Sequence, residues 1–191
     1  SEPNLQQQLV EIGYQGKKLE ELEGLSAAEK ANMLFIVQDP YTSYYDAKVV
    51  RDFVALTQKL GFEPIILPFK PNGKAMHIKG FLTRFSKTAK TQAEFLNRVA
   101  KLNVPLVGVD PAIVLSYRDE YKEVLGDSRG DFHVLTAHEW LTNQLESNAL
   151  QSAVKNIAKS DRTFEWHLFP HCTESTFMPN SPKEWQHIFA Q

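Results

Sequence analysis

The stretch PLVGVDPAIVLSYRDEY, residues 105–121, joins the most strand-like run of this chain to a helical pattern. Residues 106–109 are apolar and rich in β-branched side chains, which predicts a short strand buried on both faces. Asp110 and Pro111 follow at once. Proline needs no backbone donor in the first turn of a helix, and aspartate accepts hydrogen bonds from the free amides there, so the pair predicts a helix start.

The same arrangement occurs upstream. Residues 33–39, MLFIVQD, form a second buried-strand run, which ends in Asp39 and Pro40 before a helical pattern that begins near Asp46. Two strands that both end in Asp-Pro indicate an open parallel sheet, in which the loops at the carboxyl edge form the binding site.

The rest of the chain alternates between the two patterns. Further strands are predicted at 62–69, 132–136 and 163–169, with helices at 49–60, 82–103, 111–125, 138–145 and 149–158. Such alternation predicts an α/β fold with an open, mostly parallel sheet of about four to five strands and helices on both faces, a Rossmann-like three-layer arrangement. We expect a helical lead-in over residues 1–30 and a single α/β domain over residues 31–191.

Composition narrows the class of protein. A formal net charge of −2 and 42% hydrophobic residues describe a soluble globular protein with no overall attraction to nucleic acid or anionic membranes. No apolar run reaches membrane-spanning length, and no signal-peptide pattern opens the chain. The single cysteine, Cys172, excludes an internal disulfide and favours a reducing, cytoplasmic setting. Because the chain begins with serine and stops just after an amphipathic stretch, we expect a piece of a longer protein.

One segment is strongly basic. Between residues 70 and 101 eight basic residues face a single acid, Glu94; the eight are Lys70, Lys74, Lys79, Arg84, Lys87, Lys90, Arg98 and Lys101. Two interpretations stay open: a solvated helix face, or a docking surface for an acidic partner or an anionic ligand.

If the sheet is parallel, five segments meet at its carboxyl edge, namely 39–43, 70–73, 110–112, 136–138 and 171–174. Asp39 and Asp110 either cap the helices that follow them or act directly in chemistry, and both can be true. No glycine-rich phosphate loop is present.

The histidines and the cysteine raise two further possibilities. A zinc site would combine His167, His171 and Cys172, with His133 and His138 as further ligands. Adjacent residues on a strand point to opposite faces, so structural histidines are the simpler explanation. Nothing nearby supports Cys172 as a nucleophile paired with a histidine.

Three segments carry a family resemblance. PNGKAMHIKGFL (71–82), GVDPAIVLSYRDEY (108–121) and HLFPHCTEST (167–176) resemble the cysteine-rich (CCG) domain at the C-terminal end of large FAD-linked oxidoreductases that also hold iron-sulfur clusters. These oxidoreductases are of the D-2-hydroxyglutarate and D-lactate dehydrogenase type. The resemblance runs from about residue 33 to the end of the chain.

The chain departs from the family at most cysteine positions. Ala112 and Ile113 replace a Ser-Cys pair after the Asp-Pro corner, and Pro71 and Asn72 stand where the first repeat has cysteines. A cubane cluster needs about four thiolates, so this piece is unable to hold one alone.

The second repeat keeps one thiol. The resemblance makes Cys172 the candidate metal ligand, next to His171, and assigns Asp39, Asn72, Asp110 and His171 to the cofactor-binding rim. It implies no catalytic residue in this chain.

The resemblance implies the C-terminal domain of a flavin- and iron-sulfur-dependent D-2-hydroxyacid dehydrogenase, which is not catalytic alone. FAD would sit on another domain, and a 4Fe-4S cluster would belong to the full-length protein. The expected partners are the flavin and iron-sulfur domains of the same chain and an electron acceptor. A homo-oligomer and a monomer both stay open. Two alternatives remain: a non-redox docking module with a degenerate cluster site, and an independent α/β enzyme that uses Asp39, Asp110 and Cys172.

Overall fold

In this computed structural model, the described residues are 4–147, 150, 165 and 167–191. Within them, four strands form one parallel sheet in the order β2-β1-β3-β4. Their bounds are β1 (Met33–Val37), β2 (Glu63–Ile66), β3 (Leu106–Gly108) and β4 (Val134–Thr136). The predicted fold class, an open parallel α/β sheet, is confirmed.

The strand register explains why β1 is apolar throughout. Phe35 pairs with Ile65 of β2 on one side and with Leu106 of β3 on the other, and Leu106 in turn pairs with Val134 of β4. All four side chains are buried in one apolar cluster. The next residue of β1, Ile36, belongs to a second cluster on the opposite face. Both faces of the sheet are therefore covered.

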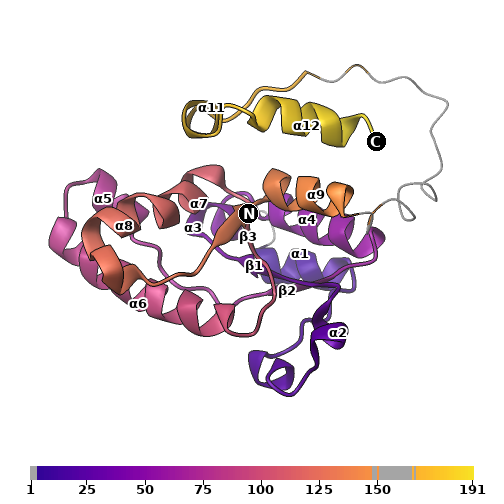
Figure 1. The fold of residues 1–191 in the computed structure, drawn as a ribbon, viewed down its shortest axis with the longest axis horizontal. Coiled ribbons are helices and arrows are strands. Elements are labelled where there is room, and N and C mark those ends of the chain that lie inside the picture. The colour runs from indigo at the N-terminus through magenta and orange to yellow at the C-terminus, as the bar shows by residue number, and fades with distance from the viewer. Residues whose placement is uncertain (1–3, 148–149, 151–164, 166) are drawn as a thin grey trace.

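The helices divide between these two clusters (Figure 1). One face carries α6 (Leu82–Ala100), α7 (Pro111–Arg118) and α8 (Glu120–Leu125), while the other carries α1 (Leu5–Glu11), α4 (Ala47–Lys59) and α9 (Ala137–Glu146). The other helical elements are η1 (Leu19–Leu22), α2 (Ala27–Lys30), α3 (Pro40–Tyr44), α5 (Lys74–Ile78), η2 (Gly126–Arg129), α11 (Cys172–Phe177) and α12 (Ser181–Phe189).

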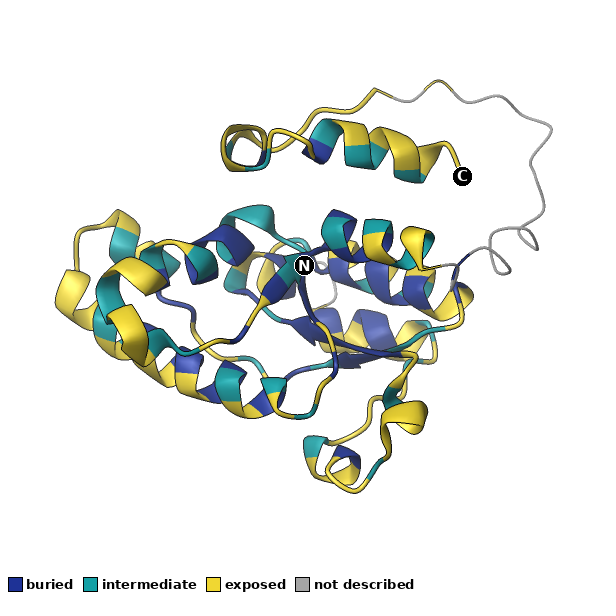
Figure 2. Cartoon of the chain, viewed as in Figure 1, coloured by how far each residue is buried: buried dark blue, intermediate teal, exposed yellow. Residues whose placement is uncertain are grey.

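The first helix is packed into the domain. Leu5 and Leu9 of α1 are buried in the same cluster as Ile36, and α1 lies against α4. Between residues 4 and 30 the structure has three short helical elements, α1, η1 and α2, and α1 contributes to the core (Figure 2).

The last third of the chain differs from the expected pattern. Residues 165 and 167–169 belong to no strand, and the rest of the strand predicted at 163–169 lies outside the described residues. The helix predicted at 149–158 also lies outside them, apart from Leu150. Cys172 begins α11 instead of continuing a strand, and Figure 1 shows α12 beside α9 and α11 beside α7.

Glycine ends β3 for a steric reason. A Cβ atom at Gly108 would lie 2.4 Å from Cγ2 of Val114 in α7. The missing side chain lets α7 turn back closely over the sheet, which fixes the Asp110 corner at the carboxyl edge. Among the described residues, no helix combines the length and the apolar character needed to span a membrane.

Candidate functional site

Both Asp-Pro corners are helix caps. The Asp39 carboxylate accepts from the backbone amides of Tyr41 at 2.8 Å and Thr42 at 3.0 Å, at the start of α3. Asp110 accepts from the amides of Ala112 at 2.8 Å and Ile113 at 3.4 Å, at the start of α7. The capping interpretation is confirmed, and a chemical role for either aspartate stays a prediction.

The carboxyl groups of Asp39 and Asp110 also interact electrostatically. Burial raises the pKa of Asp39, and the nearby charge of Asp110 raises it further, while hydrogen bonds from Thr42 and the backbone oppose this. The Asp39 side chain is buried, and its second oxygen accepts from the Thr42 hydroxyl. The adjacency of β1 and β3 thus brings the two carboxyl groups into electrostatic contact, as the parallel sheet predicted.

Asn72 lies in the loop after β2 and is also buried. Its Oδ1 accepts from the Lys74 amide at 2.9 Å, and its backbone carbonyl accepts from the Tyr121 hydroxyl at 2.6 Å. The first bond fixes the orientation of the side-chain amide, so Nδ2 is the donor. Within the described chain this donor has no partner.

The backbone conformation after Asn72 requires glycine at position 73. Its φ of +81° is in the left-handed region, and a Cβ there would lie 2.8 Å from the Phe85 ring. Only glycine meets both demands without strain. This explains why Gly73 accompanies Asn72 at the edge of the sheet.

Asp39 and Asn72 line one cavity of about 350 Å³. Its walls are largely apolar and come from three elements, with Tyr41 on α3, Met76 and Ile78 on α5, and Ile113 on α7. The structure therefore brings together Asp39, Asn72 and the first turn of the helix that Asp110 caps. A small number of polar groups inside apolar walls is typical of a binding site.

His171 and Cys172 lie on a different element. His171 is the N-cap of α11, where its Nδ1 accepts from the Thr173 amide at 3.2 Å, and Cys172 is exposed at the first helical position. Helix α11 packs against α7, but neither residue lines the cavity. In the described ranges, no group of three histidine, cysteine or acidic residues is placed to hold a metal ion. A ligand role for Cys172 remains a prediction.

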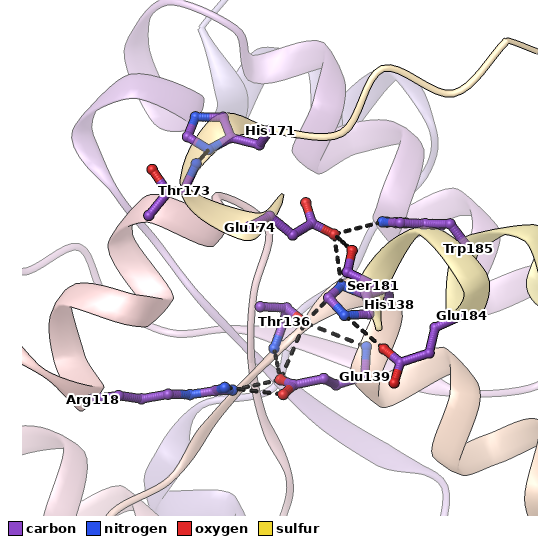
Figure 3. A network of polar contacts seen from close by, with 10 residues as sticks. All are labelled: Arg118, Thr136, His138, Glu139, His171, Thr173, Glu174, Ser181, Glu184 and Trp185. Atoms are coloured by element: carbon purple, nitrogen blue, oxygen red, sulfur yellow. Dashed lines mark hydrogen bonds and ion pairs between the residues drawn. The ribbon is translucent and has the colours of Figure 1, made fainter. Parts of the chain in front are cut away.

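Sequence reasoning missed a buried polar network around His138 (Figure 3). Nδ1 of His138 lies 2.9 Å from Oγ1 of Thr136 and 3.3 Å from Oε1 of Glu174, and Nε2 lies 3.0 Å from Oε2 of Glu184. The histidine side chain is only 1% exposed. The structure thus assigns His138 to a hydrogen-bonded core position, the simpler of the two interpretations.

Glu174 is the centre of the C-terminal part of this network. It also accepts from the Ser181 hydroxyl and, at 2.9 Å, from Nε1 of Trp185. One buried carboxylate therefore joins α11, α12 and α9. No local sequence pattern indicates these contacts, because Glu174 and His138 are far apart in the chain.

A second ion pair lies beside this network. Nη1 of Arg118 donates to Oε1 of Glu139 at 3.0 Å, and Nη2 donates to Oε2 of the same carboxylate. Nη2 also donates to the Val134 carbonyl at 2.7 Å. Burial works against ionisation of Glu139, but the hydrogen bonds and the charge of Arg118, with help from Thr136, lower its pKa. The TAHE segment, residues 136–139, forms a capping box at the start of α9 and is the one local signal that marks this site.

The known proteins that resemble this chain share one name. Over 191 residues the chain is 80% identical to a Haemophilus influenzae protein and 56% identical to an Escherichia coli protein, both named D-2-hydroxyglutarate dehydrogenase. A Pseudomonas putida protein of the same name is 35% identical over 170 residues. This chain is similar to one part of such dehydrogenases.

The similarity covers all of this chain but a small part of each relative. The chain spans 19% of the Haemophilus protein and 18% of the Escherichia protein. No family model and no solved structure matches it. The names agree with the oxidoreductase type expected from the resemblance, whereas FAD, the 4Fe-4S cluster and the CCG assignment remain predictions.

Proposed function

We propose that this chain is the C-terminal domain of a D-2-hydroxyglutarate dehydrogenase that carries FAD on another domain. The observation that supports this proposal is the 80% identity that extends over the whole chain, together with the 19% share of the relative that it covers. The full-length protein would oxidise the 2-hydroxyl carbon of D-2-hydroxyglutarate to a ketone; FAD would supply the hydride acceptor, and the hydroxyl proton would pass to a base outside this chain. This chain would contribute no catalytic residue to that step.

The residues of this chain do not fit a 4Fe-4S cluster by themselves. Such a cluster needs about four thiolates, and the chain has one, Cys172. Asn72 and Ile113, which stand at family cysteine positions, line an apolar cavity whose lining residues include no cysteine thiolate. The cavity is therefore a scaffold and docking element in this proposal, and no electron-transfer step passes through it.

The first experiment measures turnover by the full-length protein with an artificial dye as electron acceptor. We expect oxidation of D-2-hydroxyglutarate, little oxidation of the L enantiomer, and flavin bound to the protein. Absence of D-2-hydroxyglutarate oxidation by a flavin-loaded preparation would reject the proposal. Cell fractionation tests the accompanying expectation of a cytoplasmic location, and light scattering tests for a homo-oligomer.

A second candidate role concerns Cys172. It is exposed on α11, so a cluster whose other ligands come from elsewhere in the protein can reach it. Cys172→Ser in the full-length protein should then lower the iron and sulfide content and slow transfer to the acceptor. Ser175→Ala, on the exposed side of the same helix, is the matched control. Unchanged iron content in Cys172→Ser would leave the docking role as the remaining one.

A further inference from the structure

Large apolar side chains are exposed around the mouth of the Asn72 cavity. Tyr41 and Ile78 line the cavity and are 59% and 72% exposed. Phe81 and Leu82, which follow α5, are 52% and 57% exposed, and the Phe81 amide donates to the carbonyl of Met76 in the cavity wall. We call these four residues the collar. Single exposed apolar residues are common, but a group of them beside a cavity marks an interaction surface.

One residue that lines the cavity carries a hydrogen-bond donor without a partner in the described chain. Nδ2 of Asn72 has no partner in the described chain, although the residue is only 3% exposed. The oxygens of Asp39 already accept from two amides and a hydroxyl. Lys74, which also lines the cavity, is paired with Glu120. The cavity lining therefore suits an uncharged acceptor such as a backbone carbonyl, because an anion would meet the Asp39 carboxylate.

The rim beside the collar is basic. Lys79, Arg84 and Lys87 are exposed, and the structure shows no ion pair for them within the residues it describes. The Arg84 guanidinium lies 5.8 Å from the centre of the Phe81 ring. An apolar centre with a charged rim is the usual anatomy of a protein interface, and a basic rim is complementary to acidic side chains.

We propose that another part of the same polypeptide docks on the collar. It places an apolar side chain in the cavity, a backbone carbonyl on Nδ2 of Asn72, and acidic side chains opposite Lys79 and Arg84. The proposal rests on the proposed function, since it requires the longer dehydrogenase chain. The occupant is assigned to that chain because about four fifths of the length of the 80% identical relative lies outside the matched region. Permanent interfaces also carry more apolar surface than transient ones.

Hydroxyl-radical footprinting of the full-length protein tests this arrangement. The matched reference is Val10 on α1, which is 71% exposed against 72% for Ile78. After correction for intrinsic reactivity, we expect Tyr41, Ile78 and Phe81 to be labelled several-fold more slowly than Val10. Labelling of the collar at the rate that its exposure in this domain predicts would overturn the proposal.

Dilution identifies the occupant. Protection that persists at a tenfold lower protein concentration, together with a photo-cross-linker at position 78 that joins two sites of one chain, supports docking within the polypeptide. Protection lost on dilution, or a cross-link between two chains, assigns the collar to a second copy and overturns the proposal.

Two glutamate substitutions complete the test. Ile78→Glu should speed amide exchange over residues 74–82 in the full-length protein, whereas Val10→Glu should leave that segment unchanged. Dye-linked oxidation of D-2-hydroxyglutarate is measured on the same unmodified preparation. A shielded collar without oxidation would reject the dehydrogenase function alone, and oxidation with an unshielded collar would reject the docking alone.

Discussion

Nδ1 of His138 lies 3.3 Å from Oε1 of Glu174, and the two side chains are 1% and 5% exposed. On the other side of the ring, Nε2 faces Glu184 at 3.0 Å. This arrangement connects α9, which follows the sheet directly, to both C-terminal helices. Since Cys172 lies two residues before Glu174 on α11, the buried contact also determines where the one thiol of the chain is held.

Removal of the Glu174 carboxylate should loosen the C-terminal helices. Glu174→Ala leaves His138, Ser181 and the Trp185 indole without their shared acceptor, which costs about 1–3 kcal/mol in unfolding free energy. We expect faster amide exchange in α11 and α12 and little change in the strands. Glu165→Ala, whose side chain is 87% exposed, is the control. Equal exchange rates in the two variants would contradict the assigned role.

The Arg118–Glu139 ion pair should make the unfolding free energy fall at acid pH. Because the pKa of Glu139 is lowered in the folded state, its contribution is present above the ordinary value of 4.5 and is lost as pH falls through the folded pKa. Arg118→Met should lower the unfolding free energy at pH 7 by about 1–3 kcal/mol and flatten its fall below the ordinary pKa. Urea unfolding between pH 7 and pH 3 measures both effects, and parallel curves for the two proteins would refute the prediction.

For Asp39 the pKa shift, and with it the pH dependence of stability, has the opposite direction. Its pKa is raised above the ordinary value of 3.8, so its protonation favours the folded state, and this contribution is lost as pH rises through the folded pKa. Asp39→Asn keeps an acceptor for the α3 amides without the buried charge, and its stability relative to wild type should increase with pH and then level off. Asp39→Ala should lose about 1 kcal/mol through the missing cap.

Urea unfolding of the Asp39 variants at several pH values makes this comparison. Asp127→Asn on the exposed η2 element serves as the reference for a carboxylate without this environment. A pH-independent difference between Asp39→Asn and wild type would show that burial of the charge has no effect on folding.

Gly108→Ala should displace α7. The added Cβ would approach Cγ2 of Val114 to 2.4 Å, and overpacking of this kind costs about 1–3 kcal/mol. The double variant Gly108→Ala with Val114→Ala should recover part of that loss, because the clashing methyl is gone. Gly24→Ala, where no atom lies within 4 Å of the new Cβ, is the control. Additive losses in the double variant would exclude this contact as the cause.

Local sequence patterns were enough to predict the centre of the fold. The apolar runs at β1 and β3 are continuous because both faces of each strand are covered, and the Asp-Pro pairs behind them cap α3 and α7. These signals act between neighbouring residues, so a single sequence reveals them. The short helices α3 and α5 escaped prediction, since five residues hold too little periodicity to be recognised.

Tertiary structure alone decided the polar contacts and the position of the thiol. The alternation before Pro170 suggested a strand that would carry His171 and Cys172 to the sheet, yet Cys172 begins a helix held by Glu174. The free donor on Asn72 likewise follows from how the loop after β2 packs against Tyr121. The sequence by itself determined strands, corners and the parallel sheet, because these depend on adjacent residues. Partners tens of residues apart depend on how helices pack across that sheet, so only the folded chain selects them.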